Sequence, residues 1–199
     1  MKKQFIAVIA LVGLSVFSLP ALSAEFVANQ VKTLKDMQIT SKVYMKGEKM
    51  RMEMKVPGSP MTTIMVVDRE THDSFMLMPQ QKMYMAIPAG QQPDEMPGLE
   101  DLKKKYKFEQ KDLGEETVNG YKCKKTHVKF EDKQKGEMTQ WFSEELNFIV
   151  KLVATSSEHG EMTVELKDIE KKSVNDDLFQ IPPGYKKMPA MGGLKGFGG

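Results

Sequence analysis

Residues 49–56, with the sequence Lys-Met-Arg-Met-Glu-Met-Lys-Val, alternate charged and apolar side chains without a break. A period of two is the period of a β-strand, because successive side chains of a strand point to opposite sides of the sheet. The segment is therefore predicted to be a strand with a charged side facing water and a methionine side turned inward. A strand with two such different sides has a strongly specified register.

Methionine is concentrated in and around this strand. Ten of the 17 methionines lie between residues 45 and 85, and they recur in neighbouring strand-like segments. These ten residues are Met45, Met50, Met52, Met54, Met61, Met65, Met76, Met78, Met83 and Met85. Three interpretations of the methionine side are open: ordinary core, a surface for an apolar ligand, or a site for a soft metal ion.

Turn residues divide the chain into short strands joined by short loops, which is typical of an antiparallel meander. Asn119-Gly120 is the strongest hairpin signal in the chain. Residues 26–36 fit either a strand or a helix, and residues 99–105 are predicted to be a short helix, with acids first and lysines last. The predicted strands are 38–46, 49–56, 61–67, 72–78, 82–87, 108–118, 121–130, 137–142, 148–155 and 161–167. The predicted fold class is mainly β (α+β), a curved antiparallel sheet or half-open barrel with one or two short helices.

The N-terminus has the features of a secretory signal peptide. Lys2 and Lys3 precede an apolar stretch at 5–19, and small residues follow, so cleavage is expected after Ser23 or Ala24. We therefore expect residues 1–24 to be removed on export to the periplasm, leaving one domain at 25–187. Residues 188–199 contain five glycines and are expected to form a flexible tail.

The charge of the predicted mature chain is balanced. The full chain has 29 basic and 27 acidic residues, and loss of Lys2 and Lys3 makes the two numbers equal. A net charge near zero gives no electrostatic reason to expect nucleic acid as a partner.

The residues that commonly carry catalysis form no recognisable motif. His72, His127 and His159 are far apart in the sequence, and none belongs to a metal-binding or nucleophile motif. Cys123 is the only cysteine, which excludes an internal disulfide and leaves three interpretations: a buried apolar residue, a free thiol or an intermolecular bridge. We expect no enzymatic activity, no cofactor and no conventional metal site.

The spacing of the methionines bears on the metal interpretation. Thioethers favour Cu(I), but two methionines in a Met-x-Met pair lie about 7 Å apart on one strand face, too far to chelate one ion easily. A metal site would therefore need methionines from adjacent strands. An apolar ligand has no such requirement, because flexible and polarizable methionine side chains repack around varied partners.

Three stretches resemble the LolA/LolB-like superfamily of periplasmic lipoprotein carriers. They are the methionine-rich strands that include Met76-Leu-Met78-Pro79, the segment 113–123 around Asn119-Gly120, and the segment 178–185 with the sequence Leu-Phe-Gln-Ile-Pro-Pro-Gly-Tyr. The resemblance implies an incomplete antiparallel barrel with a helical lid over an apolar cavity. It also implies a carrier that holds acyl chains, although this chain offers little helix for a lid.

These observations together predict a periplasmic, non-enzymatic protein that holds a lipid or acylated partner in an apolar concave cavity. Brief contact with a membrane or an envelope protein is expected as well. The alternative function is Cu(I) binding by cross-strand methionines. Phe75, Leu77, Phe148 and Leu166 are further candidates for the cavity wall. The predicted ligand-binding residues are Met45, Met50, Met52, Met54, Met65, Met76, Met78, Met83, Met85 and Phe142.

Overall fold

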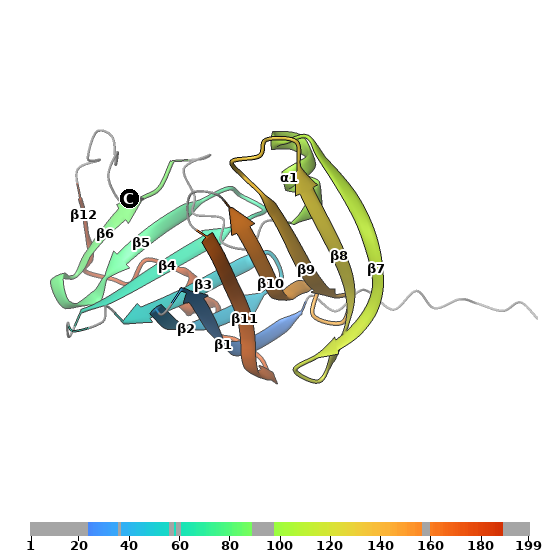
Figure 1. Cartoon of the computed structure of the whole chain (residues 1–199). Coiled ribbons are helices and arrows are strands. Elements are labelled where there is room, and N and C mark those ends of the chain that lie inside the picture. The colour runs from blue at the N-terminus through green and yellow to red at the C-terminus, as the bar shows by residue number, and fades with distance from the viewer. Residues whose placement is uncertain are drawn as a thin grey trace, which may run out of the picture.

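The computed structural model describes residues 24–35, 37–55, 58, 61–88, 98–156 and 160–188. They form one mainly β, open and curved sheet of twelve strands in the order β12-β6-β5-β4-β3-β2-β1-β11-β10-β9-β8-β7, whose edge strands stay apart (Figure 1). All neighbours are antiparallel except β12 and β6. The strands are β1 (Glu25–Leu34), β2 (Met37–Lys46), β3 (Lys49–Lys55), β4 (Thr62–Asp68), β5 (Ser74–Met78), β6 (Met83–Ala86), β7 (Phe108–Val118), β8 (Tyr121–Phe130), β9 (Glu137–Ser143), β10 (Phe148–Ser156), β11 (Gly160–Lys171) and β12 (Lys186–Lys187).

Local hairpins build the sheet in two halves. One half is β2–β6 and the other is β7–β11, and each strand in a half pairs with its neighbour in the sequence. The β7–β8 hairpin turns at Asn119 and Gly120, which both have positive φ as a type I′ turn requires. The predicted strands and the predicted curved antiparallel sheet are thus confirmed.

Strand β1 joins the two halves. It pairs with β2 on one side and with β11 on the other, where its register runs from Phe26–Lys171 to Leu34–Met162. A bulge between Val27 and Asn29 interrupts the β11 pairing and bends the strand. Residues 26–34 of the ambiguous segment are therefore a strand, whose role is decided by long-range pairing.

The single α-helix among the described residues, α1 (Leu99–Lys105), matches the predicted one. A seven-residue helix is too short to be stable alone, so packing must hold it in place. Leu102 is buried in the main apolar cluster and Leu99 packs against that cluster. We call the side of the sheet that bears this helix the inner face and the opposite side the outer face.

The C-terminal segment covers part of the outer face. A second apolar cluster joins Ile64, Val66 and Leu77 of β4 and β5 to Val174 and Phe179. Phe75 and Leu77 alternate with the methionines of β5, and both belong to this outer cluster. The prediction that they line the inner cavity is therefore wrong, because the period of two places them on the other side of the sheet.

Polar contacts hold the C-terminal segment in the same position. The Arg51 guanidinium, nearly buried, donates to the carbonyl of Leu178 at 2.8 Å and contacts Glu53 at 2.9 Å. Lys46 donates to the carbonyl of Val174 at 3.1 Å and to the Asp176 carboxylate at 2.8 Å. The hydrogen bond to Asp176 raises the pKa of Lys46 above its usual value. The segment 174–188 therefore acts as a strap, and its end adds β12 to the edge of the sheet.

Several sequence-based expectations fall outside the described residues. These are the signal peptide up to residue 23, the tail from residue 189, positions 89–97 of the proline-rich loop, and His159. Within the described part of the chain, no helix has both the length and the hydropathy needed to cross a membrane.

Replacing Phe179 tests the strap. Phe179→Ala is expected to lower the free energy of unfolding by about 3 kcal/mol, because removal of the large phenylalanine side chain leaves a cavity in the outer cluster. The control is Ile181→Ala in the same segment: Ile181 is 37% exposed, against 8% for Phe179, so its loss should cost no more than about 0.5 kcal/mol. Urea unfolding measures both, and equal losses would contradict the role of the strap.

Candidate ligand-binding face

The methionines of the first half lie on one side of the sheet, in register across the strands. Met52 of β3 pairs with Met65 of β4, which pairs with Met76 of β5, which pairs with Met85 of β6. The same side carries two further direct pairs, Met45–Met50 and Met78–Met83. All nine methionines that were predicted to bind ligand therefore share a face. Whether they bind ligand stays a prediction.

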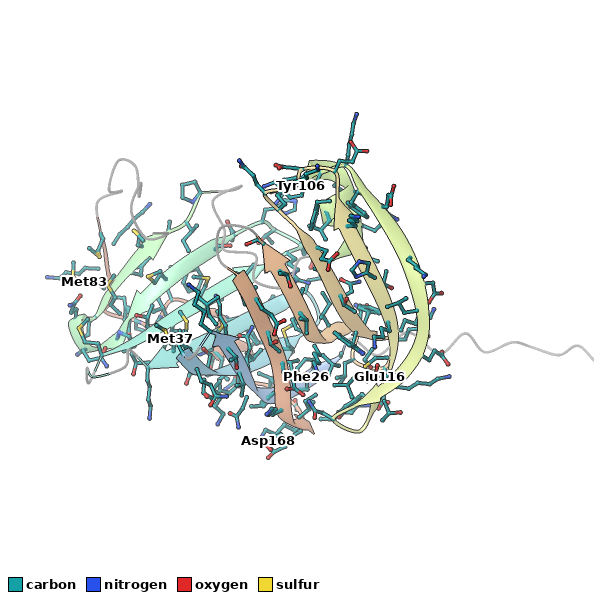
Figure 2. All side chains as sticks on the ribbon, in the orientation of Figure 1. Phe26, Met37, Met83, Tyr106, Glu116 and Asp168 are labelled. Carbon is teal, nitrogen blue, oxygen red and sulfur yellow. The ribbon has the colours of Figure 1, made fainter. Side chains whose placement is uncertain are left out.

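Their burial divides them into two groups. Met45, Met52 and Met65 are each 4% exposed, and act as ordinary core. The other six are half-buried: Met50, Met54, Met76, Met78, Met83 and Met85. Burial thus decreases toward β5 and β6, and Met83 lies at the β6 end of the sheet, far from Tyr106 at the β7 end (Figure 2).

Phe142 of β9 lies on the same face as the methionines, but in the other half of the sheet. The pairing register places four side chains on one side of the sheet: Gln30 of β1, Leu166 of β11, Leu152 of β10 and Gln140 of β9. Gln140 and Phe142 are two residues apart on β9, so their side chains point the same way. The inner face is therefore one continuous surface across both halves.

A cavity of about 430 Å³ opens between α1 and the inner face of β7–β10. Its apolar wall is formed by Leu99 of α1 together with Phe142, Phe148 and Ile149. The remaining lining residues are polar or small: Arg69, Gly98, Glu100, Gln110, Asp112, Lys124, Thr126, Gln140 and Asn147. A second cavity of about 650 Å³ lies beside the β2–β3 turn, but most of its lining side chains are charged, so it suits an apolar ligand less well.

Arg69 brings the two halves together at the cavity. Its backbone N–H donates to the Glu48 carbonyl at 3.1 Å, which holds the β4–β5 turn against the β2–β3 turn. Its guanidinium lies 5.7 Å from the ring centre of Phe148, within the range of a cation–π contact. Phe148 also packs edge-to-face on Phe26 of β1, with ring centres 6.0 Å apart. The apolar wall is therefore in contact with Arg69 of the first half and with Phe26 of β1.

The charged side chains of the cavity are balanced in sign. Arg69 and Lys124 are cationic, and Glu100 and Asp112 are anionic. Lys124 forms an ion pair with Glu144 at 2.5 Å, which raises the pKa of Lys124 and lowers the pKa of Glu144. Asp112 accepts a hydrogen bond from the backbone N–H of Gly114 at 2.8 Å. The polar part of the cavity therefore carries no strong net charge.

Among the described residues, Cys123, His72 and His127 do not form a reactive group with one another. Cys123 is 1% exposed and lies in the main apolar cluster, which supports its interpretation as a buried apolar residue. Burial raises the pKa of its thiol, so the nucleophilic thiolate is disfavoured. His127 is hydrogen-bonded to Thr139 and His72 lies in an exposed turn. Among the described residues, no group of three His, Cys, Asp or Glu side chains could hold a metal ion.

Sequence reasoning missed much of the cavity lining, including Arg69, Leu99, Thr126, Gln140 and Ile149. The spacing of Leu99 and Leu102, three residues apart on a helix, indicates which side of α1 is buried. No local signal predicts that Arg69 reaches Phe148, because that contact depends on how the two halves meet.

Comparison with known families identifies a family but no activity. A family model described as "Domain of unknown function (DUF4412)" matches residues 29–147 and 138–185. The chain therefore belongs to this family. A search of curated protein sequences found no significant match.

Solved structures share the fold at low sequence identity. An uncharacterized conserved protein from Thermus thermophilus has a TM-score of 0.58 at 11% identity, covering 84% of this chain and 91% of the other. The complex structure of Pseudomonas aeruginosa MucA/MucB contains a match with a TM-score of 0.55 at 12% identity, covering 80% of this chain and 56% of that one. At identities this low, these two matches show a likeness of fold alone.

Thiol labelling tests the burial of Cys123. An aromatic disulfide reagent at pH 8 is expected to label the native protein at least about 100-fold more slowly than the urea-unfolded protein, because labelling requires local opening. The control is Thr117→Cys in a Cys123→Ser background, which places a cysteine at an exposed position of β7 and should react rapidly. Equally fast labelling of native Cys123 would restore the free-thiol interpretation.

Proposed function

We propose that this member of the DUF4412 family is an exported, non-enzymatic binding protein that holds a lipid or the acyl chain of a partner on the inner face of its sheet. The proposal rests on one observation above all, the cavity of about 430 Å³ whose apolar wall is formed by α1 and by strands β9 and β10. Cavities that bind small ligands usually measure about 300–1,000 Å³ and are mainly apolar.

The methionine side chains extend this surface beyond the cavity. Six of them are half-buried on the same inner face, so an acyl chain leaving the cavity would still contact apolar atoms. Unbranched methionine side chains have three rotatable bonds and repack readily, which suits a long and flexible ligand. We therefore assign the ligand-binding role to Phe142 and these six methionines, with Met45, Met52 and Met65 supporting them from the core.

The polar side of the cavity suits a ligand that is an amphiphile. Arg69, Glu100, Asp112 and Lys124 line the cavity with both signs of charge, while Phe142, Phe148 and Ile149 contribute apolar wall. Such an arrangement can keep a polar head near water and bury the hydrocarbon part. The predicted signal peptide supports a periplasmic location, where lipids and acylated proteins are available. The shared fold by itself does not identify the ligand.

Ligand identification and a chain-length series test the proposal. Mass spectrometry of organic extracts from the purified protein is expected to detect an amphiphile, and the delipidated protein should bind fluorescent fatty acids. Each buried methylene contributes about 0.8 kcal/mol, so the Kd should fall about fourfold per methylene until the cavity is filled. An empty extract together with a Kd that is independent of chain length would refute the proposal.

A charge placed in the cavity wall tests its location. Phe142→Glu is expected to raise the Kd for a C12 fatty acid about tenfold or more. The bound ligand would either bury the carboxylate introduced at position 142 or lose its contact with the wall. Displacement of a fluorescent fatty acid measures this change.

The matched control is Ile181→Glu, which adds the same charge at an exposed position of the outer strap. It should leave the Kd unchanged, and equal urea midpoints would confirm that both variants are folded. If the two variants bind equally well, the ligand does not occupy the cavity beside Phe142.

A further inference from the structure

Four methionines face inward on the β5–β6 hairpin. The hairpin reads Met76-Leu-Met78, then a turn at Pro79–Gln81 and Lys82, then Met83-Tyr-Met85. Met76 lies directly opposite Met85, and Met78 lies directly opposite Met83. All four side chains are half-buried and remain partly accessible. We name Met76, Met78, Met83 and Met85 the methionine quartet.

The register brings four thioethers within reach of one point. Directly opposed side chains in an antiparallel pair have Cβ atoms about 4.5–5.5 Å apart, and alternate residues along a strand are about 7 Å apart. The four Cβ atoms therefore outline a rectangle whose centre lies about 4 Å from each corner. Each sulfur lies two bonds beyond its Cβ on a flexible side chain, so the sulfurs can converge above this centre. A single Met-x-Met pair lacks this geometry, whereas two paired ones have it.

The backbone beneath the quartet is held on three sides. On the outer face, Leu77 is fully buried and Tyr84 packs against the same outer cluster, which includes Phe179. Along one edge β5 pairs with β4, and along the other edge β6 pairs with β12. A site on such a hairpin needs little backbone ordering when an ion binds, and only the methionine side chains have to rearrange.

The ligand type selects the metal. Neutral, soft thioethers favour Cu(I) and offer little to Ca²⁺, Mg²⁺ or Zn²⁺, which prefer oxygen, nitrogen or thiolate ligands. Among the described residues no cluster of three His, Cys, Asp or Glu side chains offers a competing site. We propose that the methionine quartet binds one monovalent soft metal ion, Cu(I), for which Ag(I) is a redox-inert substitute. This metal site goes beyond the proposed lipid binding and does not depend on it.

Methionine methyl NMR can locate the ion. The chain from residue 25 onward contains every strand of the sheet, and it would be labelled at the methionine methyl carbons, delipidated and titrated anaerobically with Cu(I) or Ag(I). The expected result is a shift of the four quartet resonances at one equivalent of metal, while Met45, Met52 and Met65 stay unchanged. Zn²⁺ should shift none of them.

Competition with a chromophoric Cu(I) chelator measures the affinity. The variant Met76→Leu/Met78→Leu/Met83→Leu/Met85→Leu should lose at least about tenfold in affinity, because leucine preserves volume but removes the sulfur ligands. The matched control removes four methionines elsewhere, Met37→Leu/Met61→Leu/Met138→Leu/Met162→Leu, and should bind as the parent does. If the fourfold variant fails to fold, the pairs Met76→Leu/Met85→Leu and Met78→Leu/Met83→Leu are compared separately, and each should weaken binding.

Three results would overturn the site: no retention of Cu(I) against the chelator, an equal loss in the control variant, or shifts confined to methionines outside the quartet. Fatty-acid binding by the same preparations separates this outcome from the function proposed above. A protein that binds fatty acid but retains no Cu(I) would refute only the metal site. Retention of Cu(I) without fatty-acid binding would refute only the lipid proposal.

Discussion

The pairing of β1 with β11 is the interaction on which the rest of the structure depends. Each half of the sheet can form from local hairpins, but the cavity of the second half also takes Arg69 from the first half. By pairing with β2 and β11, β1 turns two meanders into one sheet and gives them a common inner face. Of the strand pairs in the sheet, this one joins the residues that are farthest apart in the sequence, and it brings Phe26 against Phe148, beside Arg69. The wall of the proposed ligand cavity is therefore supported by contacts between segments that are distant in the sequence.

The two faces of the first half of the sheet have different tasks. The outer face is closed by the C-terminal strap, through the cluster around Leu77 and Phe179 and the contacts of Arg51 and Lys46. The inner face is closed only in part, by buried methionines near β1 and by α1 over the other half. Because the strap contributes stability from outside, the inner side chains of β5 and β6 can remain adaptable. A surface that must accept a flexible chain, or gather around an ion, needs such freedom.

The sequence predicted which segments form strands more reliably than it predicted which segments contact one another. The alternation in 49–56 identifies a strand and its methionine side, and Asn119-Gly120 identifies a hairpin, because both signals act over a few residues. Phe75 and Leu77 were assigned to the wrong side, although their alternation with Met76 and Met78 already separates them from the methionines. The segment 26–36 could not be assigned, since the strand conformation of residues 26–34 depends on pairing with β2 and β11. The strap was also missed, because its contacts with β2 and β3 join residues more than 120 positions apart.

The sequence by itself determined most of the strands, that the methionines within a strand such as 49–56 share one side of that strand, and that no familiar catalytic motif is present. These properties follow from short-range backbone geometry and from residue chemistry. Only the tertiary structure decided that Phe142 lies on the same face as those methionines, that Arg69 reaches Phe148, and that Met76 and Met78 lie opposite Met85 and Met83. Such relations depend on strand order and register, which are set by packing between distant segments. The period of a single strand carries no information about its neighbours.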